Sequence, residues 1–157
     1  MSGFLQCVIA ECEAGSEKNV AADLITRFFG SAKILRSQHG KPYLADTPEL
    51  HFNISHTKGY AAIAVSDREV GIDVELYERL VNVRDPDRFA RRVFHPDEII
   101  SGLSLAELWT RKEAYLKMLG TGFTQNPRAL NTLNTPGIRI QEVFSDGIAL
   151  CAVSVTI

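Results

Sequence analysis

Cysteine is scarce in this chain, and no two cysteines are spaced like a metal-binding pair. Cys7, Cys12 and Cys151 are the three present among 157 residues, an odd number without a CxxC motif. Such a set argues against a disulfide framework and against a zinc site. We therefore expect a reducing, cytoplasmic environment.

Long apolar runs and an excess of charge of one sign are also lacking. No apolar segment approaches the roughly 20 residues of a membrane span, and no basic region precedes the short apolar stretch at the N-terminus. We expect neither membrane association nor a signal peptide. The formal net charge of −2 gives no reason to expect nucleic-acid binding.

Start and stop signals for helices mark four segments. Each expected helix follows a serine, aspartate or histidine that can cap its first turn, and the two longer helices end at a glycine. The expected helices are 17–29, one beginning at Pro86, one beginning at Pro96, and 105–119.

Apolar residues alternate with polar ones, or run together, in the segments expected to be strands. These segments are 4–10, 50–56, 60–65, 70–75, 138–144 and 148–157, with 60–65 and 70–75 forming one hairpin and the last two forming another. Composition and length fit a single domain over 1–157. We expect an α+β fold of two similar α/β halves, 1–67 and 68–157, related by a pseudo-twofold axis. Each half would hold a small antiparallel sheet packed with helix.

The segment "VGIDVE" (70–75) places two carboxylates on one side of an apolar strand. Alternate side chains point the same way along a strand, so Asp73 and Glu75 share a face. Two carboxylates that lie close together and partly buried repel each other and are costly to desolvate. The arrangement therefore needs a cation or another partner.

The expected helix 105–119 carries charge where its apolar stripe should be continuous. At about 100° per residue, Lys112 falls inside the stripe, Glu113 lies at its edge and Lys117 follows one turn later. On the helix alone, two interpretations remain open. The charges form an internal Lys112–Glu113 arrangement or extend to water, or they converge on a ligand.

Together, the strand and the helix favour the ligand. Asp73, Glu75 and Glu113 would suit Mg²⁺, which prefers oxygen ligands and fills its other positions with water and phosphate. Lysines beside such a site are expected where phosphate oxygens complete the coordination.

Five motifs occur in a specific order. They are "GKPYL" (40–44), "FNISHT" (52–57), "VGIDVE" (70–75), "FHPDE" (94–98) and "LWTRKEAYLKMLGTGF" (108–123). In this order and spacing the chain resembles the phosphopantetheinyl transferases of the surfactin-synthetase-activating type. The resemblance extends over roughly residues 36 to 125.

The resemblance implies an enzyme that transfers the 4′-phosphopantetheine arm of coenzyme A to a serine of an acyl or peptidyl carrier protein. The reaction would need Mg²⁺ and release 3′,5′-ADP, and the protein would act as a monomer. The implied metal ligands are Asp73, Glu75 and Glu113; the implied catalytic residues are Glu113, Lys117 and His56; the implied substrate-binding residues are Lys41, Pro42, Ser55, His56, Lys112 and Lys117. Glu98 matches a family position near the active site.

One departure from the family concerns coenzyme A. Only about 40 residues precede "GKPY", fewer than in full-length members. Lys33, Arg36 and Lys41 are therefore the basic residues expected to replace those that hold the 3′-phosphate.

Rival interpretations come from other classes of protein. A catalytically weak family member would act as a carrier-protein-binding module, and an unrelated protein would be a Mg²⁺–nucleotide-binding regulator. A serine hydrolase is disfavoured, because Ser55 and His56 are strand neighbours that point to opposite faces and no nucleophile elbow surrounds them.

A cluster of arginines has two interpretations. It is either a solvated helix face paired with nearby carboxylates, or a docking patch for an acidic carrier protein. Its members are Arg79, Arg84, Arg88, Arg91 and Arg92.

Overall fold

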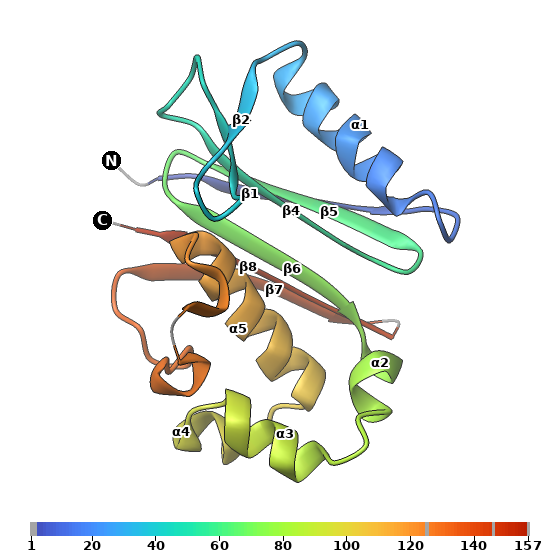
Figure 1. The fold of residues 1–157 in the computed structure, drawn as a ribbon, viewed down its shortest axis with the longest axis vertical. Coiled ribbons are helices and arrows are strands. Elements are labelled where there is room, and N and C mark those ends of the chain that lie inside the picture. The colour runs from blue at the N-terminus through green and yellow to red at the C-terminus, as the bar shows by residue number, and fades with distance from the viewer. Residues whose placement is uncertain (1–2, 125, 146, 157) are drawn as a thin grey trace.

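The computed structural model describes residues 3–124, 126–145 and 147–156, and it contains two three-stranded antiparallel sheets that lie between two long helices (Figure 1). The first sheet has the order β1–β5–β4, with β1 at Leu5–Glu11, β4 at His51–Thr57 and β5 at Tyr60–Ser66. The second has the order β6–β8–β7, with β6 at Val70–Leu76, β7 at Ile138–Ser145 and β8 at Ile148–Val155.

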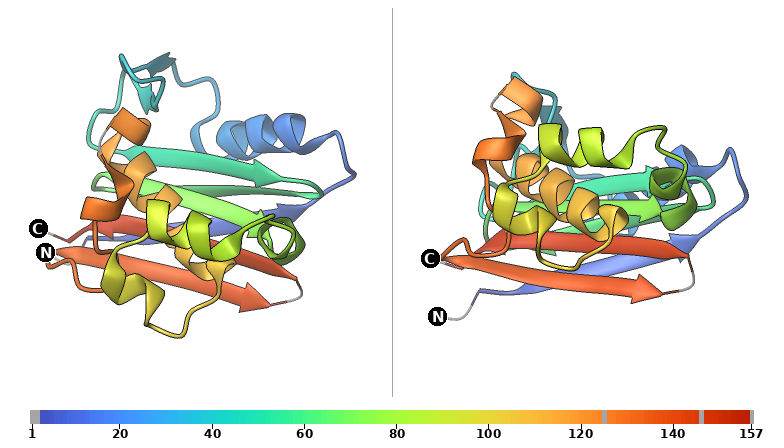
Figure 2. Two further views of the ribbon diagram at one scale, coloured as in Figure 1. Left: turned by 60° about the horizontal axis from the view of Figure 1, so that its bottom comes forward. Right: turned by 90° about the horizontal axis from the view of Figure 1, so that it is seen from below.

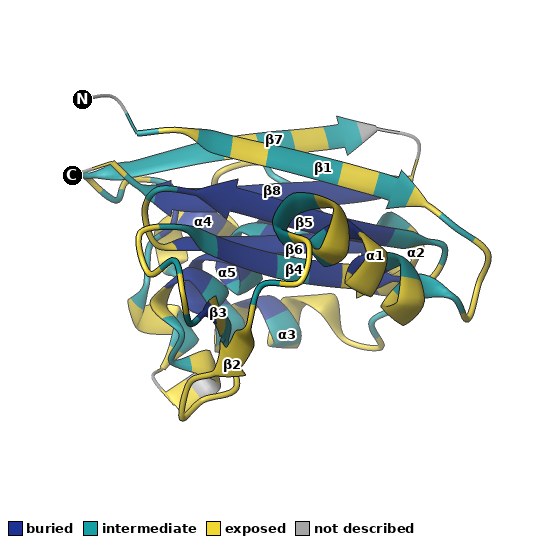
Figure 3. Cartoon of the chain, turned by 90° about the horizontal axis from the view of Figure 1, so that it is seen from above, coloured by how far each residue is buried: buried dark blue, intermediate teal, exposed yellow. Residues whose placement is uncertain are grey.

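A long helix covers the outer face of each sheet, and the inner faces pack on each other (Figure 2). Helix α1 (Glu17–Phe29) packs on the first sheet, and α5 (Leu105–Leu119) packs on the second. Small residues of β5, Ala62 and Ala64, meet the β-branched face of β6 between the sheets. The middle strands are buried, whereas the edge strands β1 and β7 carry exposed side chains (Figure 3).

Shorter elements occupy the connections. A two-stranded ribbon joins α1 to β4, three short helices join β6 to α5, and two 3-10 turns follow α5. Their bounds are β2 Ile34–Arg36, β3 Pro42–Leu44, α2 Tyr77–Val81, α3 Pro86–Val93, α4 Pro96–Ile99, η1 Gly122–Thr124 and η2 Pro127–Ala129. No helix within the described ranges is long and apolar enough to cross a bilayer.

The predicted α+β architecture of small antiparallel sheets packed with helices is confirmed, and so are the four helices. The bounds 17–29 and 105–119 agree with α1 and α5, and the Ser104–Glu107 capping box begins α5 as expected. The C-terminal hairpin is also present as β7 and β8, although its turn residue Asp146 and the terminal Ile157 lie outside the described residues.

The predicted hairpin of 60–65 and 70–75 is wrong. Strand β5 pairs with β1 and β4, while β6 pairs with β8 in the other sheet. The tight turn lies one connection earlier, at Lys58–Gly59, where Thr57 and Tyr60 are paired and Gly59 adopts a φ of 81°. A two-residue turn with positive φ suits the twist of a hairpin, so β5 forms its hairpin with β4. Residues 67–69 then carry the chain from the first sheet to the second.

The two sheets meet along a polar seam between β4 and β6. The strands belong to different sheets, yet the Asn53 side chain accepts a hydrogen bond from the amide of Ile72 at 3.0 Å and Ser55 Oγ accepts one from Val74 at 3.3 Å. Both contacts join residues 19 apart, so the strands run in the same direction. Polar side chains of β4 thus satisfy amides of β6 at the junction of the two sheets.

Candidate active site

The outer face of β6 faces α5 at unusually short range. A Cβ atom added to Gly71 would lie 1.9 Å from the carbonyl oxygen of Ala114 and 2.4 Å from the amide nitrogen of Met118. Only glycine fits there, because any side chain would overlap the helix backbone. The close approach places the next residues on this face, Asp73 and Glu75, beside α5.

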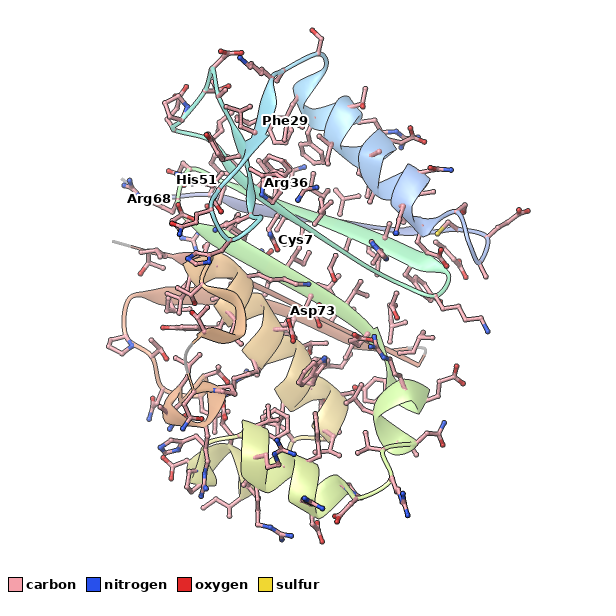
Figure 4. All side chains as sticks on the ribbon, in the orientation of Figure 1. Cys7, Phe29, Arg36, His51, Arg68 and Asp73 are labelled. Carbon is pink, nitrogen blue, oxygen red and sulfur yellow. The ribbon has the colours of Figure 1, made fainter. Side chains whose placement is uncertain are left out.

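Asp73 is almost completely buried between β6 and α5 (Figure 4). Its Oδ1 accepts hydrogen bonds from Lys117 Nζ at 2.7 Å and from Ser55 Oγ at 2.9 Å. Its Oδ2 is buried and has no hydrogen-bond partner among the described residues. Burial raises the pKa of Asp73, and the Lys117 ammonium opposes this shift.

Glu75 is also buried, and its partners come from α2 and β4. Arg79, one helical turn further along the chain, places Nη1 2.6 Å from Glu75 Oε1, and Thr57 Oγ1 donates to Oε2 at 3.3 Å. Burial and the charge of Asp73 raise the pKa of Glu75, while Arg79 opposes the rise. Each β6 carboxylate therefore has one basic residue and one hydroxyl.

Glu113 of α5 completes the carboxylate trio. It is half-buried, and within the described residues its carboxylate takes part in no hydrogen bond or ion pair. Burial, with the charge of Asp73 second, raises its pKa from 4.5 to about 7. Without a bound cation, Glu113 is thus partly protonated at neutral pH.

Lys117 lies one turn after Glu113 and connects α5 to both strands of the seam. Besides Asp73, its ammonium donates to Ser55 Oγ at 3.1 Å and to the carbonyl oxygen of Ile72 at 3.2 Å. The hydrogen-bonding capacity of Ser55 is fully used, because its hydroxyl donates to Asp73 and accepts from both Lys117 and the amide of Val74. Ser55 therefore positions charged groups and is not a free nucleophile.

These side chains surround a cavity of about 340 Å³. Its lining residues are Ile54, Ser55, His56, Asp73, Glu75, Arg79, Trp109, Glu113 and Lys117. His56 is exposed and points to the opposite side of β4 from Ser55, yet it borders the same cavity.

A second cavity of about 280 Å³ adjoins the first, since Ile54, Glu113 and Lys117 line both. The β2–β3 ribbon contributes its basic wall with Arg36 and His39, and Pro42 also lines it. The structure thus brings together three acidic groups in one cavity and basic groups in its neighbour.

Lys41 lines the second cavity, but its ammonium is engaged elsewhere. Lys41 Nζ lies 2.5 Å from Glu69 and 2.7 Å from the carbonyl oxygen of Met118. Lys41 therefore ties the ribbon to β6 and to the end of α5. Sequence reasoning did not find its partner Glu69, which precedes β6 without any motif of its own.

Lys112 does not reach either cavity. Its side chain is 0% exposed, and its ammonium lies 2.7 Å from Glu98 and 3.0 Å from the carbonyl oxygen of Pro127, with Leu130 as a third acceptor. This placement does not favour the substrate-binding role expected for Lys112, which stays a prediction. An internal Lys112–Glu113 pair is also excluded, because Lys112 pairs with Glu98.

Glu98 is equally buried and also lies outside the cavities. Its two oxygens accept from Lys112, from the backbone of His95 and from both the amide and hydroxyl of Thr132. Burial raises the pKa of Glu98, but these hydrogen bonds outweigh it and hold the pKa below its usual value. The Glu98–Lys112 pair fastens α4 and residues 127–132 to α5.

The donor set suits a hard cation in chemistry but is not arranged as a finished metal site. No group of three or more His, Cys, Asp or Glu side chains within 3–124, 126–145 and 147–156 stands close enough to hold a metal ion. The orphaned, buried Oδ2 of Asp73 and the unpaired carboxylate of Glu113 are nevertheless oxygen ligands of the kind Mg²⁺ takes. The chemistry of Asp73 and Glu113 therefore suits such an ion, and Glu75 would join them only by releasing Arg79 or Thr57.

Comparison with known proteins identifies the family. A sequence model described as the 4′-phosphopantetheinyl transferase superfamily matches residues 69–156, more than half of the chain. The chain belongs to this superfamily. The matched segment contains the three carboxylates and Lys117, whereas His56 and Lys41 lie before it.

Several curated relatives carry the same description. The 4′-phosphopantetheinyl transferase gsp of Aneurinibacillus migulanus is 34% identical over 96 residues, covering 55% of this chain and 38% of the relative. HetI of Nostoc sp. is 32% identical over 150 residues, covering 80% and 61%, and AcpT of Escherichia coli K12 is 34% identical over 100 residues, covering 56% and 49%. The chain thus covers less than two thirds of the length of each of these three relatives, from 38% to 61%.

The buried pair of Lys112 and Glu98 predicts that Lys112 stabilises the fold. We expect Lys112→Met to lower the free energy of unfolding by about 3–5 kcal/mol, because it leaves the Glu98 carboxylate buried without its cation. Urea unfolding measures the loss, and the double variant Lys112→Met/Glu98→Gln should recover part of it. A variant as stable as the parent, with weakened coenzyme A binding instead, would restore the substrate-binding role.

The pKa of Glu113 predicts how stability without metal depends on pH. The folded protein favours protonated Glu113 up to a pH of about 7, whereas the unfolded chain ionises it near 4.5. In EDTA, the contribution of Glu113 to stability should therefore fall as pH rises from about 4.5 to about 7. The side chain of Glu113→Gln stays neutral at every pH. The melting temperature of this variant should therefore exceed that of the parent by more at pH 8 than at pH 5.

Calorimetry at both pH values measures this difference. Glu78→Gln, on the exposed side of α2, is the matched control and should show no such growth. An advantage that is equal at both pH values would contradict the placement of Glu113 among the carboxylates.

Proposed function

We propose that this protein transfers 4′-phosphopantetheine from coenzyme A to a serine of an acyl or peptidyl carrier protein in the presence of Mg²⁺, releasing 3′,5′-ADP. The observation that carries the proposal is the meeting of Asp73, Glu75, Glu113 and Lys117 in one cavity beside a second, basic cavity. Named phosphopantetheinyl transferases among the relatives support the reaction class.

Asp73, Glu75 and Glu113 would hold the cation in the first cavity. When bound, the cation would neutralise the charge that develops on the 5′-phosphate of the departing 3′,5′-ADP as the pyrophosphate linkage breaks. Lys117, which lines the same cavity, would bind these phosphates, and the exposed His56 would contact them from the β4 side. Trapping both substrates in adjoining cavities would orient the serine hydroxyl toward the phosphorus atom.

Glu113 is our candidate for receiving the serine proton, directly or through water. Its carboxylate has no hydrogen-bond or ion-pair partner among the described residues, so an oxygen that the cation leaves free could accept this proton.

The second cavity would take the nucleotide end of coenzyme A. Arg36 supplies positive charge there and His39 also lines this cavity, whereas the ammonium of Lys41 is bound to Glu69. Arg36 Nη1 donates to the carbonyl oxygen of Gly40 at 2.8 Å, which fixes the guanidinium at the ribbon's turn. Of the three basic residues expected from the sequence, Arg36 is thus the one we propose for the 3′-phosphate.

A groove of about 530 Å³ along α3 would receive the carrier protein. Arg88 and Arg92 line it together with the apolar residues Phe89 and Val93, and Trp109 lines both this groove and the carboxylate cavity. An acidic helix placed on the arginines would therefore present an adjacent serine close to the phosphates. Arg91 is exposed on α3 but does not line the groove.

Mass spectrometry tests the reaction directly. The protein, mixed with coenzyme A, Mg²⁺ and an apo carrier protein, should add the mass of phosphopantetheine to the carrier. Asp73→Asn should abolish the gain without unfolding the protein. Carrier binding without any mass gain would favour a binding module, and neither binding nor gain would favour an unrelated nucleotide-binding regulator.

Charge reversal tests the groove. Arg88→Glu/Arg92→Glu should raise the KM for the carrier protein several-fold and weaken its dependence on salt, because exposed charge pairs mainly accelerate association. The KM for coenzyme A should stay unchanged. Arg84→Glu/Arg91→Glu carries the same change in net charge outside the groove, so an equal effect of both double variants would contradict docking at this site.

A further inference from the structure

The three carboxylates of the cavity differ in how their charge is balanced. Lys117 bonds to Asp73, Arg79 bonds to Glu75, and Glu113 has no partner among the described residues. Arg79 has a side chain that is 66% exposed and is held by Glu75 alone among the described side chains. The contact between Lys117 and Asp73 is more enclosed, with side chains 29% and 5% exposed.

Lys117 has no unused donor in this arrangement. An ammonium group has three N–H donors, and those of Lys117 point to Asp73, Ser55 and the backbone of Ile72. Any hydrogen bond from Lys117 to a phosphate must therefore replace one of these three.

A cation that binds Asp73 also has few oxygen atoms available to it. Its Oδ1 already bonds to Lys117 at 2.7 Å, and only its buried Oδ2 is left without a partner. A divalent cation on Asp73 would stand within a few ångströms of the Lys117 ammonium. Like charges at that range repel strongly where water is largely excluded.

We infer that Lys117 is the internal counter-cation of Asp73 in the ligand-free protein and moves from Asp73 to phosphate when a divalent cation binds. The inference rests on the proposed function, because it presupposes that Asp73 holds the cation. Its consequence is that the cation and coenzyme A each strengthen the binding of the other. The cation displaces Lys117 from Asp73, and the pyrophosphate gives the displaced ammonium a new partner.

The size of the effect follows from linkage. If coenzyme A raises the affinity for the cation by some factor, the cation raises the affinity for coenzyme A by the same factor, which is typically 5–150-fold. Removing the Lys117 charge should eliminate the competitor and the part of this mutual effect that Lys117 contributes. Lys117→Met should therefore bind the cation more tightly than the parent when coenzyme A is absent.

Mn²⁺ titrations followed by electron paramagnetic resonance test the inference without any turnover. The parent should bind Mn²⁺ about tenfold more tightly with coenzyme A present than without it. Lys117→Met should bind Mn²⁺ several-fold more tightly than the parent in the absence of coenzyme A, and adding coenzyme A should raise its affinity by a smaller factor than it does in the parent. A protein-free titration corrects for Mn²⁺ held by coenzyme A itself.

Two further variants guard the interpretation. Lys117→Gln retains amide donors toward Asp73 and Ser55 without the charge, so it should behave like Lys117→Met even if the methionine variant folds poorly. Lys18→Met removes a positive charge from the exposed side of α1, on the outer face of the first sheet, and should leave Mn²⁺ binding unchanged.

The outcomes separate the inference from the proposed function. Equal or weaker Mn²⁺ binding by both Lys117 variants without coenzyme A would overturn the counter-cation role, while loss of binding in Asp73→Asn would leave the metal site standing. A parent protein that binds no Mn²⁺, or an Asp73→Asn variant that binds it normally, would overturn the metal site and the inference with it.

Discussion

The site depends on the contact between the backbone of α5 and the outer face of β6. At Gly71 the helix comes so close that no side chain fits, and two residues later the same face of β6 presents Asp73 to Lys117. Without this close approach, Asp73 and Glu75 on β6 would lie too far from Glu113 on α5 to share one cavity. Burial raises the pKa of all three carboxylates, and the charge of Asp73 adds to the rise at Glu75 and Glu113.

Two ion pairs outside the carboxylate cavity hold α5 and β6 in this arrangement. Lys112 and Glu98 form a buried, fully hydrogen-bonded pair behind α5, and Lys41 with Glu69 ties the β2–β3 ribbon to the same region. Buried pairs add little net stability compared with apolar residues, but breaking one is costly. Two lysines of the family motifs thus hold the scaffold in place, while Lys117 alone among the motif lysines bonds a cavity carboxylate.

Local signals were sufficient for much of the fold and part of the site. The capping box at Ser104 and the glycine stop at Gly120 predicted α5 correctly, and strand alternation placed Asp73 and Glu75 on one face. Local sequence signals could not predict the contacts between segments that are distant in the chain. The direction in which Lys112 points depends on residues 127–132, and the pairing of β5 depends on the two-residue turn at Gly59. The β4–β6 seam needs a tertiary contact that no local pattern encodes.

The central claim is that one divalent cation joins β6 to α5 through three carboxylates. A crystal structure grown with Mn²⁺ and coenzyme A, with anomalous scattering recorded for manganese, measures this most directly. The account predicts a single manganese peak within coordination distance of Asp73, Glu75 and Glu113, with the pyrophosphate of coenzyme A on its open side. A structure with coenzyme A bound and the manganese peak elsewhere, or coordinated without Asp73, would contradict it.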